Sequence, residues 1–227
     1  MCRAKYGSRP GFTFILQGTF YPYEEDTAGS ASIASIAAPI TANATQANGI
    51  GYSYVQLDYA YVGSHYRENQ QDGGILSGSR QFDDNFHVFG SYSDFSAQHY
   101  SLSNKPWTLG MGFANAIGSK VDWVSRLAYS HDGVHANLCG NFDCTTTYRA
   151  HANANTYFVT TGVMGRVTDS LTLNAYLGYH DGDHDVQGFY ADFGAIYSFS
   201  PVWALHGGLT VNNNSSQTYS VGVRASF

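Results

Sequence analysis

The last nine residues of the chain alternate without interruption between apolar and polar side chains. Because side chains of a β-strand point to its two faces in turn, an alternation of period two predicts a strand with one apolar and one polar face. The apolar face of this strand carries Tyr219, Val221, Val223, Ala225 and Phe227, and the other face carries Ser220, Gly222, Arg224 and Ser226.

The same period recurs nine more times from Gly49 onward, and no stretch in between has the spacing of an amphipathic helix. Ten strands are therefore expected, and their connections alternate in length. Tight turns are expected at 83–85, 116–119, 168–170 and 200–201, and longer polar loops at 65–73, 96–105, 131–153, 181–187 and 212–216.

Short turns at one end of a sheet and long loops at the other are typical of outer-membrane barrels. Closure also leaves no strand edge whose backbone groups would lie unpaired in lipid. The sequence contains no apolar run of about 20 residues, the length that a membrane-spanning helix needs. We therefore expect an all-β fold, a closed antiparallel up-and-down transmembrane β-barrel of about ten strands.

Composition agrees with a membrane barrel. Charged residues make up 12% of the chain, about half the share in a soluble domain. The net charge is -6 and the basic residues are scattered, so no nucleic-acid partner is expected. On the predicted outer face, Arg80 is the one charged residue, and it lies near a turn. Aromatic residues near strand ends predict an interfacial belt: Tyr59, Tyr61, Tyr92, Trp107, Tyr129, Tyr157, Tyr179, Tyr197, Trp203 and Tyr219.

Residues 1–48 lack this alternation and are predicted to be separate from the barrel of residues 49–227. A small, weakly apolar run is followed by Ala42, Asn43 and Ala44, which fit the small-x-small pattern before a signal-peptidase site. We interpret the segment as a cleaved export signal behind an extended start. The alternative is an unstructured N-terminal arm.

The predicted inner face carries charges of both signs. Inside a narrow barrel such groups must pair, because an unpaired buried charge is costly. A structural network that fills the lumen is the favoured interpretation, with Arg224 paired to Asp58, Asp122 or Asp192; the alternative is the lining of an ion or solute path. Large inward residues favour filling: Tyr54, Phe89, Met164, Tyr176 and Tyr190. The predicted network is Asp58, Asp122, Arg126, Arg166, Asp192, His206 and Arg224.

Two segments carry histidines and carboxylates at the predicted loop end. They are residues 180–185 (His-Asp-Gly-Asp-His-Asp) and residues 131–135 (His-Asp-Gly-Val-His). Either could bind a divalent cation or activate water, but surface loops rich in Asp, Gly and His are usually solvated. No nucleophile-elbow, zinc-protease or phosphate-binding motif is present. We therefore predict no catalytic residue, no metal site and no cofactor.

Cys139 and Cys144 bracket a short polar segment and predict a small disulfide loop, which implies an oxidising compartment. The alternative is two free thiols. In the last strand, Tyr219, Gly222, Ala225 and Phe227 resemble the C-terminal signal that the outer-membrane assembly machinery recognises. This machinery and the lipid bilayer are the predicted partners, and no external ligand is predicted.

Four segments resemble a family of small proteobacterial outer-membrane barrels, the family of a barrel once proposed as a plant immune elicitor and quorum-sensing factor. The most specific is residues 84–93, Asp-Asn-Phe-His-Val-Phe-Gly-Ser-Tyr-Ser; the others are residues 49–59, 173–181 and 221–227. The resemblance covers residues 49–227. It implies an exported, signal-cleaved outer-membrane barrel without catalytic residues.

The sequence thus predicts a non-enzymatic bacterial outer-membrane barrel, with extracellular loops that serve adhesion, interaction or envelope integrity. The first alternative is a narrow channel for ions or small solutes. The second is an outer-membrane hydrolase that uses Asp and His at its rim, and the third is a secreted soluble binding barrel.

Overall fold

The structure is a computed structural model, and it describes residues 48–63, 70–97, 102–139, 147–183, 187–213 and 216–227. These residues belong to one compact unit, residues 40–227. No helix among them is long and apolar enough to cross a membrane. The expected division into a leader of residues 1–48 and a barrel of residues 49–227 stays a prediction, since most of the leader lies outside the described residues.

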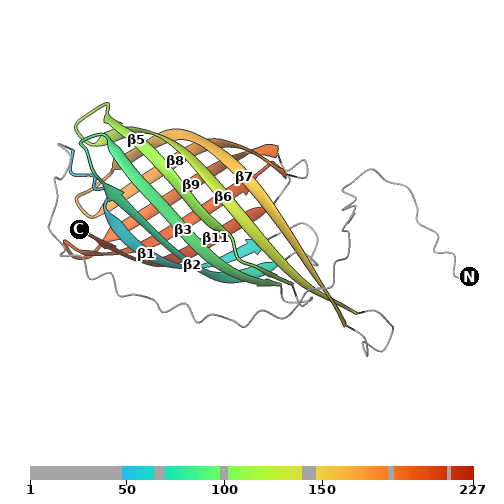
Figure 1. Cartoon of the computed structure of the whole chain (residues 1–227). Coiled ribbons are helices and arrows are strands. Elements are labelled where there is room, and N and C mark those ends of the chain that lie inside the picture. The colour runs from blue at the N-terminus through green and yellow to red at the C-terminus, as the bar shows by residue number, and fades with distance from the viewer. Residues whose placement is uncertain (1–47, 64–69, 98–101, 140–146, 184–186, 214–215) are drawn as a thin grey trace, which may run out of the picture. The chain divides into compact units, whose positions relative to one another are not determined.

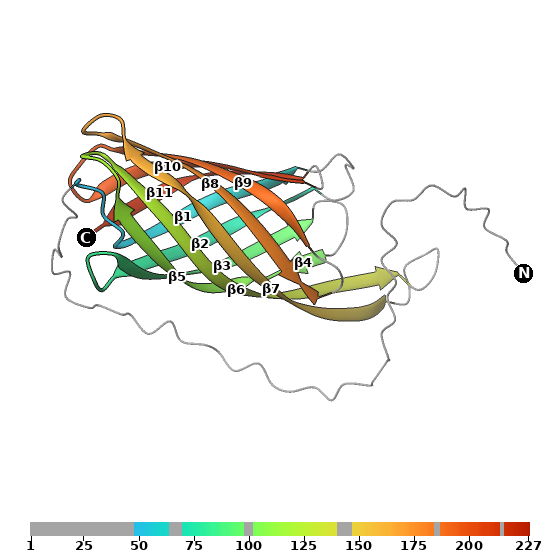
Figure 2. The same cartoon turned by 90° about the horizontal axis from the view of Figure 1, so that it is seen from above.

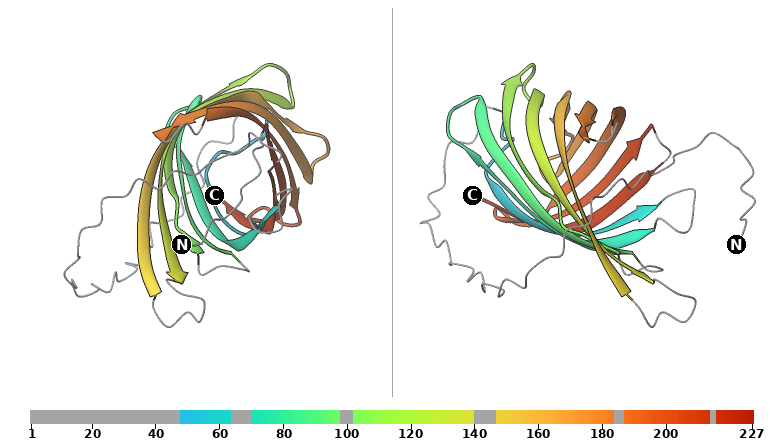
Figure 3. Two further views of the ribbon diagram at one scale, coloured as in Figure 1. Left: turned by 90° about the vertical axis from the view of Figure 1, so that its right-hand side faces the viewer. Right: turned by 45° about the vertical axis from the view of Figure 1, so that its right-hand side comes forward.

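The described residues form one antiparallel sheet that closes on itself (Figure 1). Successive strands pair with each other, and the first strand pairs with the last over its whole length. Viewed along the axis, the strands form a ring (Figure 3). The strands are β1 Tyr54–Gly63, β2 Gln71–Gln81, β3 Phe86–Ala97, β4 Leu102–Asn104, β5 Trp107–Ala116, β6 Val121–Cys139, β7 Thr147–Arg166, β8 Leu171–Gly182, β9 Gln187–Ser198, β10 Trp203–Asn212 and β11 Gln217–Ser226.

The short strand β4 and strand β5 occupy one position in the barrel. Both pair with β3 on one side and with β6 on the other. Between them, Pro106 has no N–H to donate to the ladder, so the strand is interrupted there. The neighbouring backbone groups still bond across the break, Lys105 N to Gly133 O at 3.1 Å and Ser93 N to Pro106 O at 2.9 Å. The barrel therefore has ten strand positions, which confirms the predicted fold class.

Four tight turns share one end of the barrel with the C-terminus (Figure 2). They join β2 to β3, β5 to β6, β7 to β8 and β9 to β10, as the sequence predicts. In each turn, an N–H donates to the carbonyl four residues later, as Phe82 N does to Phe86 O at 3.1 Å. The hydroxyls of Thr168 and Ser200 accept backbone N–H groups and fix two of the turns.

The opposite end differs from the expectation. Residues 131–153 were expected to form a loop, but β6 and β7 continue as a paired ribbon up to Cys139 and Thr147. The pairing of β4 with β6 stops at Ala136, and that of β8 with β7 stops at Thr156, so the ribbon extends beyond its neighbours (Figures 1 and 2). In residues 150–155 every apolar position is an alanine, and such small side chains give only a weak period-two signal, so the sequence predicts no strand there. The loop expected at 96–105 is likewise shortened by β4.

The two faces of the sheet have opposite characters. Large apolar side chains along the strands are exposed on the outside, for example Leu57, Leu109 and Leu177. Small and polar residues share the inside with a buried apolar cluster. This cluster comprises Ile50, Tyr52, Ala114, Val124, Met164, Tyr176, Ile196 and Ala204. The alternation is thus inverted relative to a soluble barrel, whose apolar side chains would point inward.

Candidate functional site in the barrel interior

Residues 48–53, just before β1, occupy the interior at the turn end. Asn48, Ile50 and Tyr52 are 2–3% exposed. The Asn48 amide donates to Asp122 Oδ1, and the Tyr52 hydroxyl donates to Asp122 Oδ2 at 2.8 Å. Asp122 itself is fully buried at the start of β6. We call residues 48–53 the plug, and Asp122 is its anchor.

Two further contacts hold the plug. The Tyr52 ring stacks on the His87 ring, with centroids 4.7 Å apart and planes at 15°. Gly49 has φ +75°, a conformation that L side chains rarely adopt, and a Cβ there would lie 2.4 Å from Arg166 Nη1. Arg166 therefore lies against the plug backbone. With Ile50 and Tyr52 in the apolar cluster, side chains fill the turn end of the lumen.

Asp58 and His206 meet across the last strand. His206 Nδ1 lies 2.8 Å from Asp58 Oδ1, and Gln56 donates to Asp58 Oδ2 at 2.6 Å. These residues come from β1 and β10, with β11 between them. Gly222 of β11 lies opposite both, and a Cβ there would come within 2.3 Å of Asp58 Oδ1. A glycine at this position is therefore required for the contact.

The arginines lie on aromatic rings. Arg224 Cζ is 3.4 Å from the centroid of Tyr54, and Arg126 Cζ is 4.7 Å from that of Tyr176 and 5.5 Å from that of Phe89. In the described part of the chain, the salt bridges are His206–Asp58 and the exposed Lys105–Asp94. The pairing expected between Arg224 and an aspartate is not made, because Tyr54 lies under its guanidinium.

Asp192 also has polar rather than cationic partners. It accepts from the Asn174 amide at 3.2 Å and from the Thr210 hydroxyl at 3.0 Å. Asp58, Asp122 and Asp192 thus have hydrogen-bond partners among amides, hydroxyls and one imidazole. The sequence located the charged residues but not these partners, since polar inward residues are too common to single out.

Large inward side chains lie over glycines of the adjacent strand. Tyr176 is paired with Gly162, where a Cβ would lie 2.1 Å from the Ala175 carbonyl and 2.7 Å from the Tyr176 ring. His87 is likewise paired with Gly112, where a Cβ would lie 2.1 Å from the ring. Because a glycine lies opposite each of these large residues on the adjacent strand, their rings can lie across the narrow lumen.

A cavity of about 230 Å³ lies on the loop side of Arg126 and Tyr176. Aromatic rings form much of its wall, with Tyr190 and Phe158 in edge-to-face contact, at 6.1 Å between centroids. Asp192 also lines it. The Tyr190 hydroxyl forms a hydrogen bond with the Thr160 hydroxyl, at 2.5 Å between the oxygens. Because the plug and the apolar cluster fill the turn end, the cavity is blind on that side.

The histidine and carboxylate segments do not gather into a site. His180 packs between Phe158 and Tyr190, at 5.8 and 6.0 Å between centroids. Asp183 accepts from the Asn155 amide and backbone. His184 and Asp185 lie outside the described residues. Among the described residues, no three histidines, cysteines or carboxylates lie close enough to hold a metal ion.

The remaining predicted positions lie at the ends of strands. The side chain of Cys139 and the whole of Cys144 lie outside the described residues, so the disulfide stays a prediction. Tyr219 points outward and is 49% exposed, and Phe227 N donates to Ser53 O at 3.2 Å, beside the plug. The role of Tyr219, Gly222, Ala225 and Phe227 in assembly also stays a prediction.

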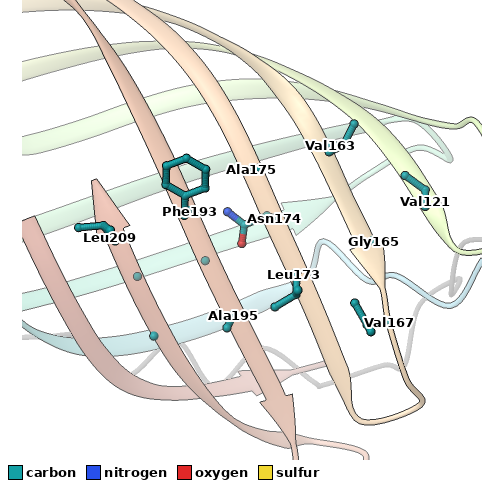
Figure 4. Close-up of a pocket in the computed structure, with 13 residues that line it drawn as sticks. Val121, Val163, Gly165, Val167, Leu173, Asn174, Ala175, Phe193, Ala195 and Leu209 are labelled. Carbon is teal, nitrogen blue, oxygen red and sulfur yellow. The ribbon is translucent and has the colours of Figure 1, made fainter. Parts of the chain in front are cut away.

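The outer face has an apolar groove over β6–β10 (Figure 4). Small residues such as Gly165, Ala175 and Ala195 leave room between the side chains of Val163, Leu173 and Phe193. The groove has a volume of about 630 Å³, and its wall is almost entirely apolar. The outer face thus offers an apolar surface in this groove.

No protein-family model matches the chain, and no curated protein matches it. Among solved structures, the chain is similar to the KdgM porin in complex with disordered oligogalacturonate (14% identity, TM-score 0.43, covering 76% of this chain and 99% of that one). It is also similar to Neisserial surface protein A (16% identity, TM-score 0.43, covering 77% of this chain and 96% of that one). A third similar structure is Ail, the attachment invasion locus protein of Yersinia pestis (13% identity, TM-score 0.42, covering 78% of this chain and 99% of that one). Because these identities and TM-scores are low, the fold is assigned from the pairing of this chain's own strands. The resemblance to a specific family stays a prediction.

Proposed function

We propose that this chain is a non-enzymatic bacterial outer-membrane barrel with a closed lumen, which acts through contacts made at its loop end. The observation that carries the membrane assignment is the inverted alternation. Exposed leucines, valines and aromatic residues cover the outside, a surface that water would disfavour. Closure leaves no edge whose backbone groups would lack partners in lipid.

Aromatic contacts on the outer face support the same assignment. At the loop end, the rings of Trp107, Tyr129 and Tyr157 form a chain, with centroids 5.5 and 5.3 Å apart. At the turn end, Phe86 and Phe113 are in contact at 5.2 Å. Rows of aromatic rings near both ends are what two membrane interfaces require. In this proposal the turns are periplasmic and the loops extracellular.

Action at the loop end is supported by the β6–β7 ribbon and by the plug. The ribbon extends beyond the neighbouring strands, where it can contact a partner without disturbing the barrel. The plug closes the turn end, which favours a role at the surface over the narrow channel that the sequence left open. We also propose that the chain belongs to the small proteobacterial barrel family that residues 84–93 resemble.

Fractionation tests the membrane assignment. The protein should sediment with outer membranes, require detergent for extraction, and migrate differently in detergent electrophoresis with and without boiling. Recovery in the soluble fraction with unchanged migration would refute it. In planar bilayers, the purified barrel should give no conductance steps above leak, with a conducting porin as positive control; regular steps would establish the channel instead.

A ribbon variant tests the loop-end role. Replacing residues 137–149 with Gly-Ser-Gly removes the ribbon beyond the pairing of β4 with β6, so the barrel should still show heat-modifiable migration. Cells that express this variant should adhere to one another and to epithelial monolayers less than cells that express the unchanged protein. Equal adherence at equal surface yield would contradict a role for the ribbon.

A further inference from the structure

The cavity on the loop side of Arg126 has the properties of a binding site. Its volume of about 230 Å³ corresponds to roughly eight waters at about 30 Å³ each. That is room for one small molecule and not for a polymer. Because the turn end is filled, a molecule that entered from the loop end would stop there.

Among the residues that line the cavity, Asp192 is the one carboxylate, and it is hydrogen-bonded to Asn174 and Thr210 rather than to Arg126. The Arg126 guanidinium is in contact with the rings of Tyr176 and Phe89, and one N–H donates weakly to the Tyr176 hydroxyl at 3.4 Å. Its Nε is buried without a hydrogen-bond partner. Among the described residues, no carboxylate forms a salt bridge with it. A guanidinium with unused donors in such a wall attracts an anion.

The other wall residues narrow the class of anion. Phe89, Phe158, Tyr176 and Tyr190 present ring surfaces, which favour an apolar or aromatic body in edge or face contact. Asp192 faces the same space, and its carboxylate keeps lone pairs for a hydroxyl donor. Because the Asp192 carboxylate repels a dianion more strongly than a monoanion, the wall favours a monoanion over phosphate.

We propose that this cavity binds a small aromatic monocarboxylate carrying a hydroxyl group. The carboxylate accepts N–H groups from Arg126, the ring packs among the four aromatic side chains, and the hydroxyl donates to Asp192. This site is independent of the ribbon, so it goes beyond the surface role proposed above.

The test uses the full barrel purified in detergent and three probes, 4-hydroxybenzoate, its neutral isostere 4-hydroxybenzamide, and inorganic phosphate. Titration calorimetry should give a dissociation constant in the millimolar range or below for 4-hydroxybenzoate. The amide should bind about tenfold or more weakly, because it loses the charge-assisted hydrogen bonds to Arg126. Phosphate should bind more weakly than 4-hydroxybenzoate.

Variants assign the binding to this cavity. Arg126→Gln should abolish binding of 4-hydroxybenzoate, whereas Arg80→Gln, on the exposed outer face, should leave it unchanged. Heat-modifiable migration checks that each variant is folded, and the comparison of acid with amide on the unchanged protein stands even if Arg126→Gln fails to fold. No binding of the acid, equal binding of acid and amide, preference for phosphate, or retained binding in folded Arg126→Gln would each overturn the proposal.

Discussion

The hydrogen bond from Tyr52 to Asp122 is the part of the plug whose contribution can be isolated by one substitution. Tyr52→Phe removes the hydroxyl and keeps the ring that stacks on His87. A second tyrosine supplies the matched control. The Tyr59 hydroxyl donates to an Asp72 carboxylate oxygen at the same distance, 2.8 Å, but on the exposed outer face.

The expected effect follows from burial. Tyr52 is 2% exposed and Asp122 0%, so the carboxylate oxygen that loses the hydroxyl cannot turn to solvent. Hydrogen bonds to charged groups contribute about 1.5–3 kcal/mol when buried, so Tyr52→Phe should lower the folding equilibrium constant about 10- to 150-fold. Tyr59→Phe should cause a much smaller change, since Asp72 is the second residue of β2, at the loop end, where interfacial water can replace the lost hydroxyl.

The assay is equilibrium unfolding of the refolded barrel in urea, followed by tryptophan fluorescence and by the heat-modifiable band. Both variants must show unchanged m-values for the midpoints to be compared. If Tyr52→Phe lowers the free energy of unfolding no more than Tyr59→Phe does, the hydrogen bond to Asp122 does not hold residues 48–53 inside the barrel. The proposal of a closed lumen then loses its main support.

Two further predictions concern the barrel wall and the C-terminus. Gly162→Ala should destabilise the barrel by about 1–3 kcal/mol, because the new methyl would overlap the Ala175 carbonyl, whereas Gly207→Ala meets open space and should be neutral or slightly stabilising in the same urea titration. Deletion of Phe227 should lower the yield of surface-exposed barrel in cells while leaving refolding of the purified protein in detergent intact; normal surface yield would contradict the proposed assembly signal.

The barrel was predictable because its determinants are local. The period-two pattern sets the strands, and short polar stretches such as 168–170 set the turns. The ladder between β1 and β11 then follows from the need to close the sheet. The break at Pro106 was also readable in principle, since proline cannot donate to a ladder on either side.

The plug and the ribbon were not predictable in the same way. In the plug, Asn48, Ile50 and Tyr52 alternate with Gly49 and Gly51, so its pattern looks like the start of a strand. Its inward course depends on Asp122, which is far away in the sequence. The ribbon has mostly small residues at the apolar positions of β7, such as Ala150, Ala152 and Ala154, and in the proposed orientation it lies beyond the membrane, where no large lipid-facing side chains are needed. A strong alternation of apolar and polar residues is expected only in strands that face lipid on one side and the lumen on the other.

Gly222 shows how a residue predicted for one reason can be required for another. Its place near the C-terminus, five residues before Phe227, resembles an assembly signal, yet its position opposite Asp58 and His206 requires a glycine for steric reasons alone. Any larger residue would separate the acid from the imidazole and leave a buried carboxylate with one partner fewer. Glycine at this position is therefore not by itself evidence for recognition by the assembly machinery, whereas Phe227, whose side chain is not needed for that contact, is the residue on which that hypothesis rests.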